Sequence, residues 1–182
     1  MKKILLIILS ASVFIACNDR EAATATVATT DSASNVQSDN APLNLPYTVD
    51  KTPDWERGAA GNVAIAMNTL RAFEINDMAA LQQYLADTVQ FYYDNIAFKG
   101  SRDSLINLFT NIRGNIDSMH VKMHDYESVK SKNRGEEWVG LWYTEMAKPK
   151  GGKADSTMVM DDIKIVNGKV AIIDSKMRRL VK

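Results

Sequence analysis

Residues 156–166 (STMVMDDIKIV), Asn167-Gly168 and residues 169–177 (KVAIIDSKM) form the stretch that decides the fold. Both flanks are rich in branched residues, as strands are, and Asn-Gly suits a two-residue type I′ turn. The stretch therefore predicts an antiparallel β-hairpin. In such a turn Val166 faces Lys169, and counting back from that pair places Asp161 directly opposite Asp174.

Two more strands are predicted before this hairpin. Residues 119–124 alternate apolar and polar side chains, a period of two with one polar side. Residues 137–146 are apolar on both sides: Trp138 and Trp142 on one, Val139, Leu141 and Tyr143 on the other. We expect this strand to be covered twice, by the domain's own helices and by a partner subunit, which predicts a homodimer formed through the sheet.

Helices are predicted in the first part of the domain. Thr52 can cap a helix and Pro53 fits its first position, so the first helix is expected from there to about residue 75. Asp77 is expected to cap a second helix that ends at Asp87. Ser101 is expected to begin a third helix.

A short hairpin is predicted between the second and third helices, from residues 88–93 and 96–99, with its turn at Asp94-Asn95. The whole order is then helix, helix, short hairpin, helix and a run of long strands. This order predicts an α+β domain in which three helices pack on one face of a curved antiparallel sheet.

Three short motifs occur in a family-specific order. They are Leu85-Ala86-Asp87-Thr88-Val89-Gln90-Phe91, Phe98-Lys99-Gly100 and Val166-Asn167-Gly168-Lys169-Val170. Over about residues 55 to 180 the chain resembles the SnoaL-like branch of the nuclear transport factor 2-like superfamily. The resemblance implies a cone-shaped fold with an apolar pocket between sheet and helices. It also implies frequent dimerisation through the sheet, and members that are isomerases, cyclases, hydrolases or binding modules.

The N-terminus reads as an export signal. Two lysines follow Met1, an apolar run covers residues 4–15, and Ala16 precedes Cys17, the only cysteine of the chain. Residues 14–17 resemble the lipobox of bacterial lipoproteins, which implies a signal peptide over residues 1–16 and lipidation of Cys17. We therefore expect a cell-envelope protein that is anchored to a membrane. The outer membrane is the favoured location, with the domain facing the periplasm or the cell surface.

A polar linker separates this anchor from the folded part. Residues 17–50 consist mainly of Ala, Thr, Ser, Asn and Asp. This segment has too few large apolar residues to build a core, so the folded domain is expected over residues 51–182. Lys plus Arg and Asp plus Glu balance at 22 each. No global field therefore draws the chain to nucleic acid, and no nucleic-acid partner is predicted.

Carboxylates supply the catalytic candidates. If Asp161 and Asp174 stand opposite in a partly apolar site, each raises the pKa of the other, which tunes an acid for general acid–base work. The alternative is that the hairpin outruns the core and both are solvated. Asp94 is a third candidate as a general base, or it simply makes the turn.

Aromatic residues supply the candidate ligand contacts. Trp142 and Tyr143 can line the pocket implied by the resemblance, although core packing or a dimer face also explains them. Tyr93 ends the first strand, where enzymes of the superfamily often place an acid or histidine. His120 and His124 lie about 13 Å apart on a strand, too far to share an ion. No metal site and no cofactor are predicted.

Three functions stay open from the sequence. The first is a lipid-anchored domain that binds a small apolar or amphipathic ligand or a protein partner. The second is an acid–base enzyme, an isomerase, cyclase or hydrolase that uses a pocket carboxylate. The third is a structural dimerisation module.

Overall fold

The computed structural model describes residues 45–51 and 54–180. Contacts between Cα atoms divide the chain into two units, Met1–Thr48 and Val49–Lys182. All the described helices and strands lie in the second unit. Its helices are α1 (Ala60–Glu74), α2 (Met78–Tyr84) and α3 (Arg102–Gly114). Its strands are β1 (Trp55–Arg57), β2 (Leu85–Tyr93), β3 (Ile96–Ser101), β4 (Ile116–Ser131), β5 (Glu137–Pro149), β6 (Asp155–Val166) and β7 (Lys169–Arg179).

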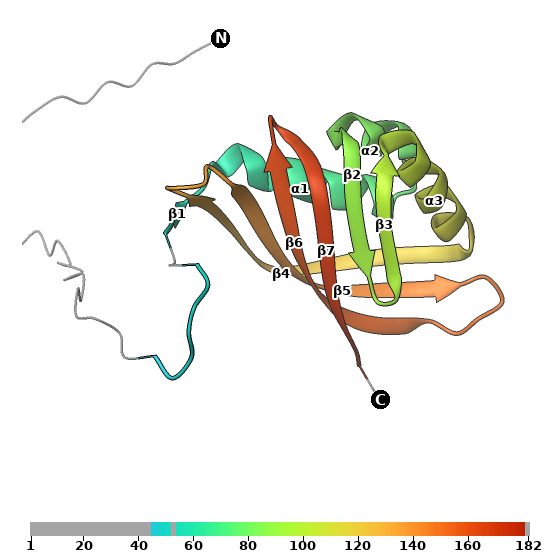
Figure 1. The fold of residues 1–182 in the computed structure, drawn as a ribbon. Coiled ribbons are helices and arrows are strands. Elements are labelled where there is room, and N and C mark those ends of the chain that lie inside the picture. Colours follow the sequence, from blue (N-terminus) through green and yellow to red (C-terminus); the bar gives the residue numbers. More distant parts are fainter. Residues whose placement is uncertain (1–44, 52–53, 181–182) are drawn as a thin grey trace, which may run out of the picture. The chain divides into compact units, whose positions relative to one another are not determined.

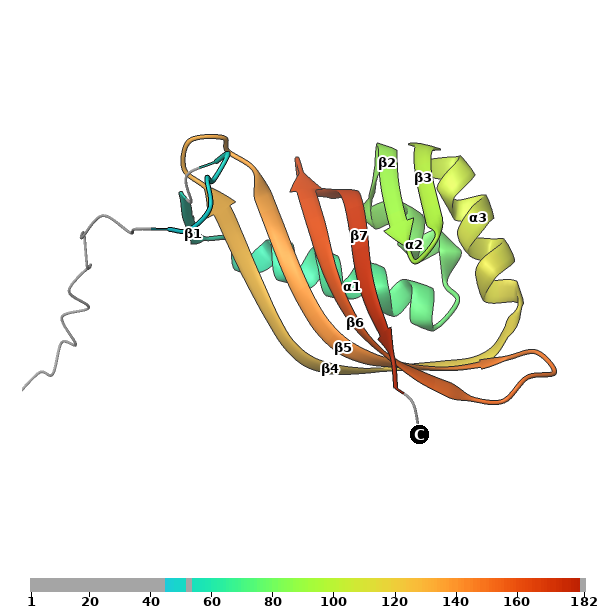
Figure 2. The ribbon, with the colours of Figure 1, turned by 60° about the horizontal axis from the view of Figure 1, so that its bottom comes forward.

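The strands form one sheet in the order β1-β4-β5-β6-β7-β2-β3. Every neighbouring pair is antiparallel except β2 and β7, which run parallel. The sheet is curved and the three helices cover one of its faces (Figures 1 and 2). Val139 and Leu141 of β5, Leu81 of α2 and Leu105 of α3 are fully buried between these layers. The α+β class predicted from the sequence is confirmed.

Local turn and cap signals in the sequence are confirmed. Asp77 accepts a hydrogen bond from the Ala80 backbone N–H at 2.9 Å and so caps α2. Ser101 caps α3 by accepting from the Ser104 N–H at 3.3 Å. The turn residues Asp94 and Asn167 both adopt φ of 51°, a left-handed conformation that Asp and Asn tolerate better than most residues.

The predicted start of the first helix is wrong. The helix begins at Ala60, and the preceding residues Trp55–Arg57 form a strand on the edge of β4. Asp54 fixes this segment, because its carboxylate accepts hydrogen bonds from Ser131 Oγ at 2.8 Å and the Asn133 N–H at 2.7 Å. The expected cap at Thr52 and Pro53 lies outside the described residues.

The predicted end of the second helix is also wrong. It ends at Tyr84, and β2 begins at once with Leu85. Leu85 and Val89 are both fully buried, so packing of this segment in the sheet outweighs any helical preference of residues 85–87.

Arg113 holds the ends of α1 and α3 together. Its guanidinium donates to the carbonyl oxygens of Phe73 and Glu74 at the end of α1, at distances from 3.0 to 3.3 Å. It also donates to the Ile116 carbonyl at 3.0 Å. The last carbonyl oxygens of a helix have no hydrogen-bond partners within that helix. For α1, the buried Arg113 of the neighbouring helix provides the missing donors.

The predicted pairing of Asp161 with Asp174 is wrong. Val166 faces Lys169 and Ile165 faces Val170 as expected, but the register then shifts, because Ala171 is an extra residue on β7. Asp161 consequently faces Ser175. This β-bulge allows Val170 and Ile173, three residues apart, to be buried in the same core.

The side chains of β5 alternate between the two faces of the sheet. Val139, Leu141 and Tyr143 are buried under the helices, whereas Trp138 and Trp142 are half-buried on the opposite face. Lys164 Nζ lies 5.5 Å from the ring centre of Trp138. The two-sided pattern of this strand is thus confirmed, and dimerisation through the face stays a prediction.

The predicted signal peptide, Cys17 and most of the linker lie outside the described residues. Among the helices that the structure does describe, none has the length and apolar character needed to cross a membrane.

Candidate functional site

A pocket of about 270 Å³ lies between the sheet and the helices. Its lining is mainly apolar, with two carboxyl groups, two tyrosine hydroxyls and one threonine. The lining residues are Thr69, Leu70, Phe73, Leu81, Phe91, Tyr93, Ile96, Phe109, Ile112, Ile116, Tyr143, Glu145, Asp161, Ile163 and Ile173. Every helix and every strand except β1 contributes to this wall, so the whole layer packing shapes it.

Strand parity places the polar groups on the pocket side. Tyr143 and Glu145 are two residues apart on β5, and Asp161 and Ile163 are two apart on β6, so each pair points to the same face. Asp161 pairs with Leu141 across the two strands, which puts Tyr143 diagonally next to it.

Asp161 is the most deeply buried acid of the pocket, with 3% of its surface exposed. Its Oδ2 accepts a hydrogen bond from the Tyr143 hydroxyl at 3.0 Å. Its Oδ1 has no hydrogen-bond partner among the described residues. Burial raises the pKa of Asp161 to about 6, although the side chains of Ser175 and Tyr143 act in the opposite direction.

Glu145 is the second acid of the pocket. Burial raises the pKa of Glu145 to about 7, and the negative charge of Asp161 adds to this effect. Both carboxyl groups therefore exchange protons near neutral pH, which is the range in which a general acid or base is most useful.

Both pocket tyrosines stay protonated. Burial raises the pKa of Tyr93 to about 12, and the charges of Glu145 and Asp161 contribute. Burial also holds the pKa of Tyr143 well above its usual range, with Asp161 as the next cause. Tyr143 is therefore a hydrogen-bond donor at physiological pH.

Aromatic rings form a contiguous part of the wall. The Phe109 ring centre lies 5.1 Å from that of Phe73 and 4.8 Å from that of Phe91, both edge-to-face. Phe91 and Tyr93 stack at 6.2 Å. Such pairs fix one another's orientation and so hold this wall in shape.

The structure brings three sequence candidates together and separates three others. Asp161, Tyr143 and Tyr93 all line the pocket. Asp94 is exposed at its turn, and Trp142 is half-buried on the opposite sheet face. None of Asp94, Trp142 and Asp174 belongs to the pocket lining.

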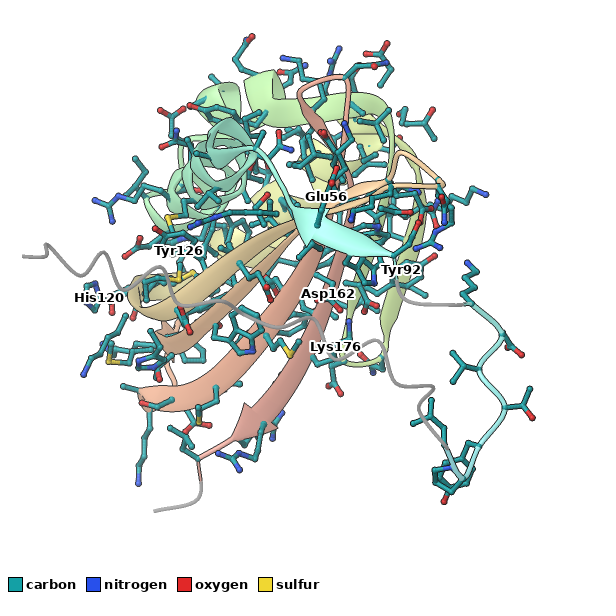
Figure 3. All side chains as sticks on the ribbon, turned by 90° about the vertical axis from the view of Figure 1, so that its left-hand side faces the viewer. Glu56, Tyr92, His120, Tyr126, Asp162 and Lys176 are labelled. Carbon is teal, nitrogen blue, oxygen red and sulfur yellow. The ribbon has the colours of Figure 1, made fainter. Side chains whose placement is uncertain are left out.

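Asp174 belongs to a surface ion cluster. It faces Asp162 across β6 and β7, and Lys176 Nζ lies 2.9 Å from Asp174 Oδ2. The same Nζ lies 2.6 Å from Asp162 Oδ2, and Figure 3 labels Asp162 and Lys176. All three side chains are substantially exposed. For Asp174 this agrees with the alternative interpretation, in which the end of the hairpin is solvated.

The sequence interpretation missed Glu145. A signal for it was available, because Glu145 has the parity of Leu141 and Tyr143 within a strand already predicted to reach Met146. Thr69 of α1 carries no comparable signal in the sequence.

The histidines lie apart from the pocket. His120 Nδ1 is 3.3 Å from Glu74 Oε1, and His124 Nε2 is 2.8 Å from Thr144 Oγ1. Residues 45–51 and 54–180 contain no group of three or more His, Cys, Asp or Glu side chains suited to a metal ion.

Comparisons with known proteins bear on the fold. Neither a protein-family model nor a curated protein matches the sequence. Solved structures do match, among them an epoxide hydrolase of the LEH-like kind from M. tuberculosis, with a TM-score of 0.53 and 16% identity over 65% of this chain and 83% of that chain.

Two further matches extend this comparison. A nuclear transport factor 2-like protein of unknown function from Burkholderia pseudomallei has a TM-score of 0.55 and 12% identity, covering 66% of this chain and 92% of that one. A protein with a ketosteroid isomerase-like fold from Catenulispora acidiphila, in complex with trimethylamine, has a TM-score of 0.52 and 11% identity, covering 62% and 83%. The chain therefore has the cone-shaped nuclear transport factor 2-like fold that its motifs resemble.

Proposed function

We propose that this nuclear transport factor 2-like domain binds a small, mainly apolar molecule in the pocket between its sheet and helices. One observation carries the proposal: an apolar cavity of about 270 Å³ is lined by two acids, Asp161 and Glu145, together with the side chains of Tyr93 and Tyr143.

The composition of the wall supports binding over a purely structural role. A pocket filled with Met and Trp side chains would favour a scaffold, but neither residue type lines this cavity. Apolar walls with a few convergent polar groups are typical of small-molecule sites.

Acid–base catalysis is the second candidate function. The pKa of Asp161 at about 6 and that of Glu145 at about 7 favour it, because one group can accept a proton while the other donates one near neutral pH. In such a mechanism Tyr143 would orient Asp161 through their hydrogen bond. It could donate to a developing oxyanion instead only by giving up that bond. One similar structure is an epoxide hydrolase, so the fold accommodates hydrolytic chemistry in that protein.

We further propose that lipidation of Cys17 anchors the domain in the cell envelope. The support is the sequence around Cys17 and the polar stretch after it, which is long enough to separate the domain from the lipid. A ligand of the domain would then be taken up at or near a membrane surface.

Extraction of small molecules from the purified protein tests the binding proposal. The full-length protein is purified in detergent from its own cells, denatured, and the released molecules are identified by mass spectrometry. We expect a compound enriched in the wild type and lost in Ile112→Trp, which fills the pocket from α3.

The matched control is Ile106→Trp, on the same helix and half-buried but outside the pocket lining. This variant should retain the compound. Equal retention in both tryptophan variants, or no enriched compound in the wild type, would contradict binding in this pocket.

A further inference from the structure

The pocket carries acid groups without basic ones. Asp161 and Glu145 are the two ionisable carboxyl groups of the lining, and no Lys, Arg or His side chain is among the described residues that line it. Above about pH 7, where both acids are ionised, a carboxylate or phosphate ligand would therefore meet like charge, with no cationic side chain in the lining to offset it. In a medium that is partly shielded from water this repulsion is strong.

Asp161 lacks a cationic partner inside the pocket. The positive charge of Lys176 lowers the pKa of Asp161, but this lysine lies in the exposed ion cluster, where it binds Asp162 and Asp174 at 2.6 and 2.9 Å. Tyr143 donates one hydrogen bond to Oδ2. Oδ1 is enclosed and has no partner at hydrogen-bond distance among the described residues, although the Ser175 side chain, which faces Asp161 across β6 and β7, lowers the pKa of this acid. Buried charges in proteins are normally paired, and no cationic side chain of the pocket lining pairs with the ionised form of Asp161.

Five aromatic rings line the same space: those of Phe73, Phe91, Tyr93, Phe109 and Tyr143. The faces of such rings carry negative potential and attract ammonium groups. The rings can pack around the apolar part of an amine. The ring faces and the carboxylates can both attract its ammonium group.

We infer that the ligand of this pocket is a hydrophobic amine, whose cationic nitrogen binds Asp161 and Glu145 and whose apolar body packs among the aromatic rings and branched side chains. The inference rests on the proposed function of the pocket and adds the chemical class of its ligand. An ammonium group in the pocket would lie against both acids of its wall, while Tyr143 keeps its bond to Oδ2 of Asp161. Hydrogen bonds between two charged groups are about twice as strong as neutral ones.

Three probes with one body test this inference: 3-phenylpropylamine, 3-phenylpropanol and 3-phenylpropanoate, which differ in the charge of the head group. Each is titrated calorimetrically at pH 8, where both acids are ionised, into the full-length protein in detergent, with a protein-free titration subtracted. We expect the amine to bind about tenfold more tightly than the alcohol, and the carboxylate to bind more weakly than either.

Variants assign the preference to the two acids. In the double variant Asp161→Asn with Glu145→Gln, the amine should lose its advantage of about tenfold, while the alcohol binds as in the wild type. Asp162→Asn, which changes the adjacent residue on the exposed face, should leave the advantage intact. Thermal unfolding of each variant checks that it is folded.

The outcomes separate the two proposals. If the alcohol binds the wild type as tightly as the amine, or the preference survives in the double variant, the amine inference is overturned while pocket binding stands. If none of the three probes binds the wild type and extraction also yields no compound, the proposed function fails and the amine inference fails with it.

Discussion

Asp161 shows how a single side chain acquires its chemistry from its surroundings. It differs from its neighbour Asp162 by one position on β6, and strand parity sends one carboxylate into the pocket and the other to the exposed ion cluster. The pKa of Asp161 rises to about 6 because its charge is removed from water. The same residue type one position away faces solvent and Lys176.

The raised pKa makes stability depend on pH. Asp161 binds its proton more tightly in the folded state, with a pKa of about 6, than at its ordinary value of 3.8. Between these values the native state holds more protons, so the free energy of unfolding falls as pH rises. The shift corresponds to about 3 kcal/mol. Asp161→Asn should therefore be more stable than the wild type at pH 8, by up to about 3 kcal/mol.

Urea denaturation at pH 4, 6 and 8 measures this effect. Glu145 contributes a fall of the same sign up to about pH 7, so the variant should retain part of the slope. Asp162→Asn serves as the control and should keep most of the wild-type fall. Identical pH profiles for Asp161→Asn and the wild type would show that Asp161 does not ionise in this range.

At the scale of elements, the bulge in β7 decides which residues share the pocket. Ala171 adds one residue to β7, which moves Ile173 to the pocket side and Asp174 to the opposite face. Without it, the two-residue turn would bring Asp174 to the side of Asp161. A single extra residue thus leaves Asp161 and Glu145 as the two acids of the pocket lining.

Deletion of Ala171 tests the role of the bulge. Removing it forces either Val170 or Ile173 out of the core, because a shift of one residue in a strand exchanges its faces. We expect a loss of about 2 kcal/mol or more in the free energy of unfolding, measured by urea denaturation, since exposing one such side chain costs that much.

The control for this deletion is Ala171→Ser, which keeps the residue count and the register and should change stability far less. A deletion variant as stable as Ala171→Ser would mean that the hairpin absorbs the missing residue elsewhere, for example at the Asn167-Gly168 turn.

At the scale of the whole molecule, the proposed lipid anchor and the folded domain belong to separate parts of the sequence. The proposed anchor is the lipidated Cys17, and the compact unit that carries the pocket begins at Val49. Cys17→Ser should therefore move the protein from the membrane to the soluble fraction and leave the domain folded. Cell fractionation followed by circular dichroism measures both results. Retention of the variant in the membrane fraction after a high-salt wash would contradict lipid anchoring.

Local signals in the sequence determined much of this domain. The Asn167-Gly168 turn, the caps at Asp77 and Ser101, and the two-sided apolar pattern of β5 act over a few residues, so the sequence carries them directly. Together they were enough for the α+β class, the order of the elements after residue 77 and the division of β5 into two faces, with Tyr143 on the face of Val139 and Leu141. Which face lines the pocket was left open.

Tertiary structure alone decided the rest, because the causes lie far apart in the chain. Asp54 accepts hydrogen bonds from Ser131 and Asn133, which are far away in the sequence. The sequence therefore could not show that the residues after Asp54 form a strand and that α1 begins only at Ala60. Residues 170–173 are all apolar and have no period of two, so their alternation could not reveal the bulge. Burial against three helices then raised the pKa of Asp161, an effect that no local pattern contains.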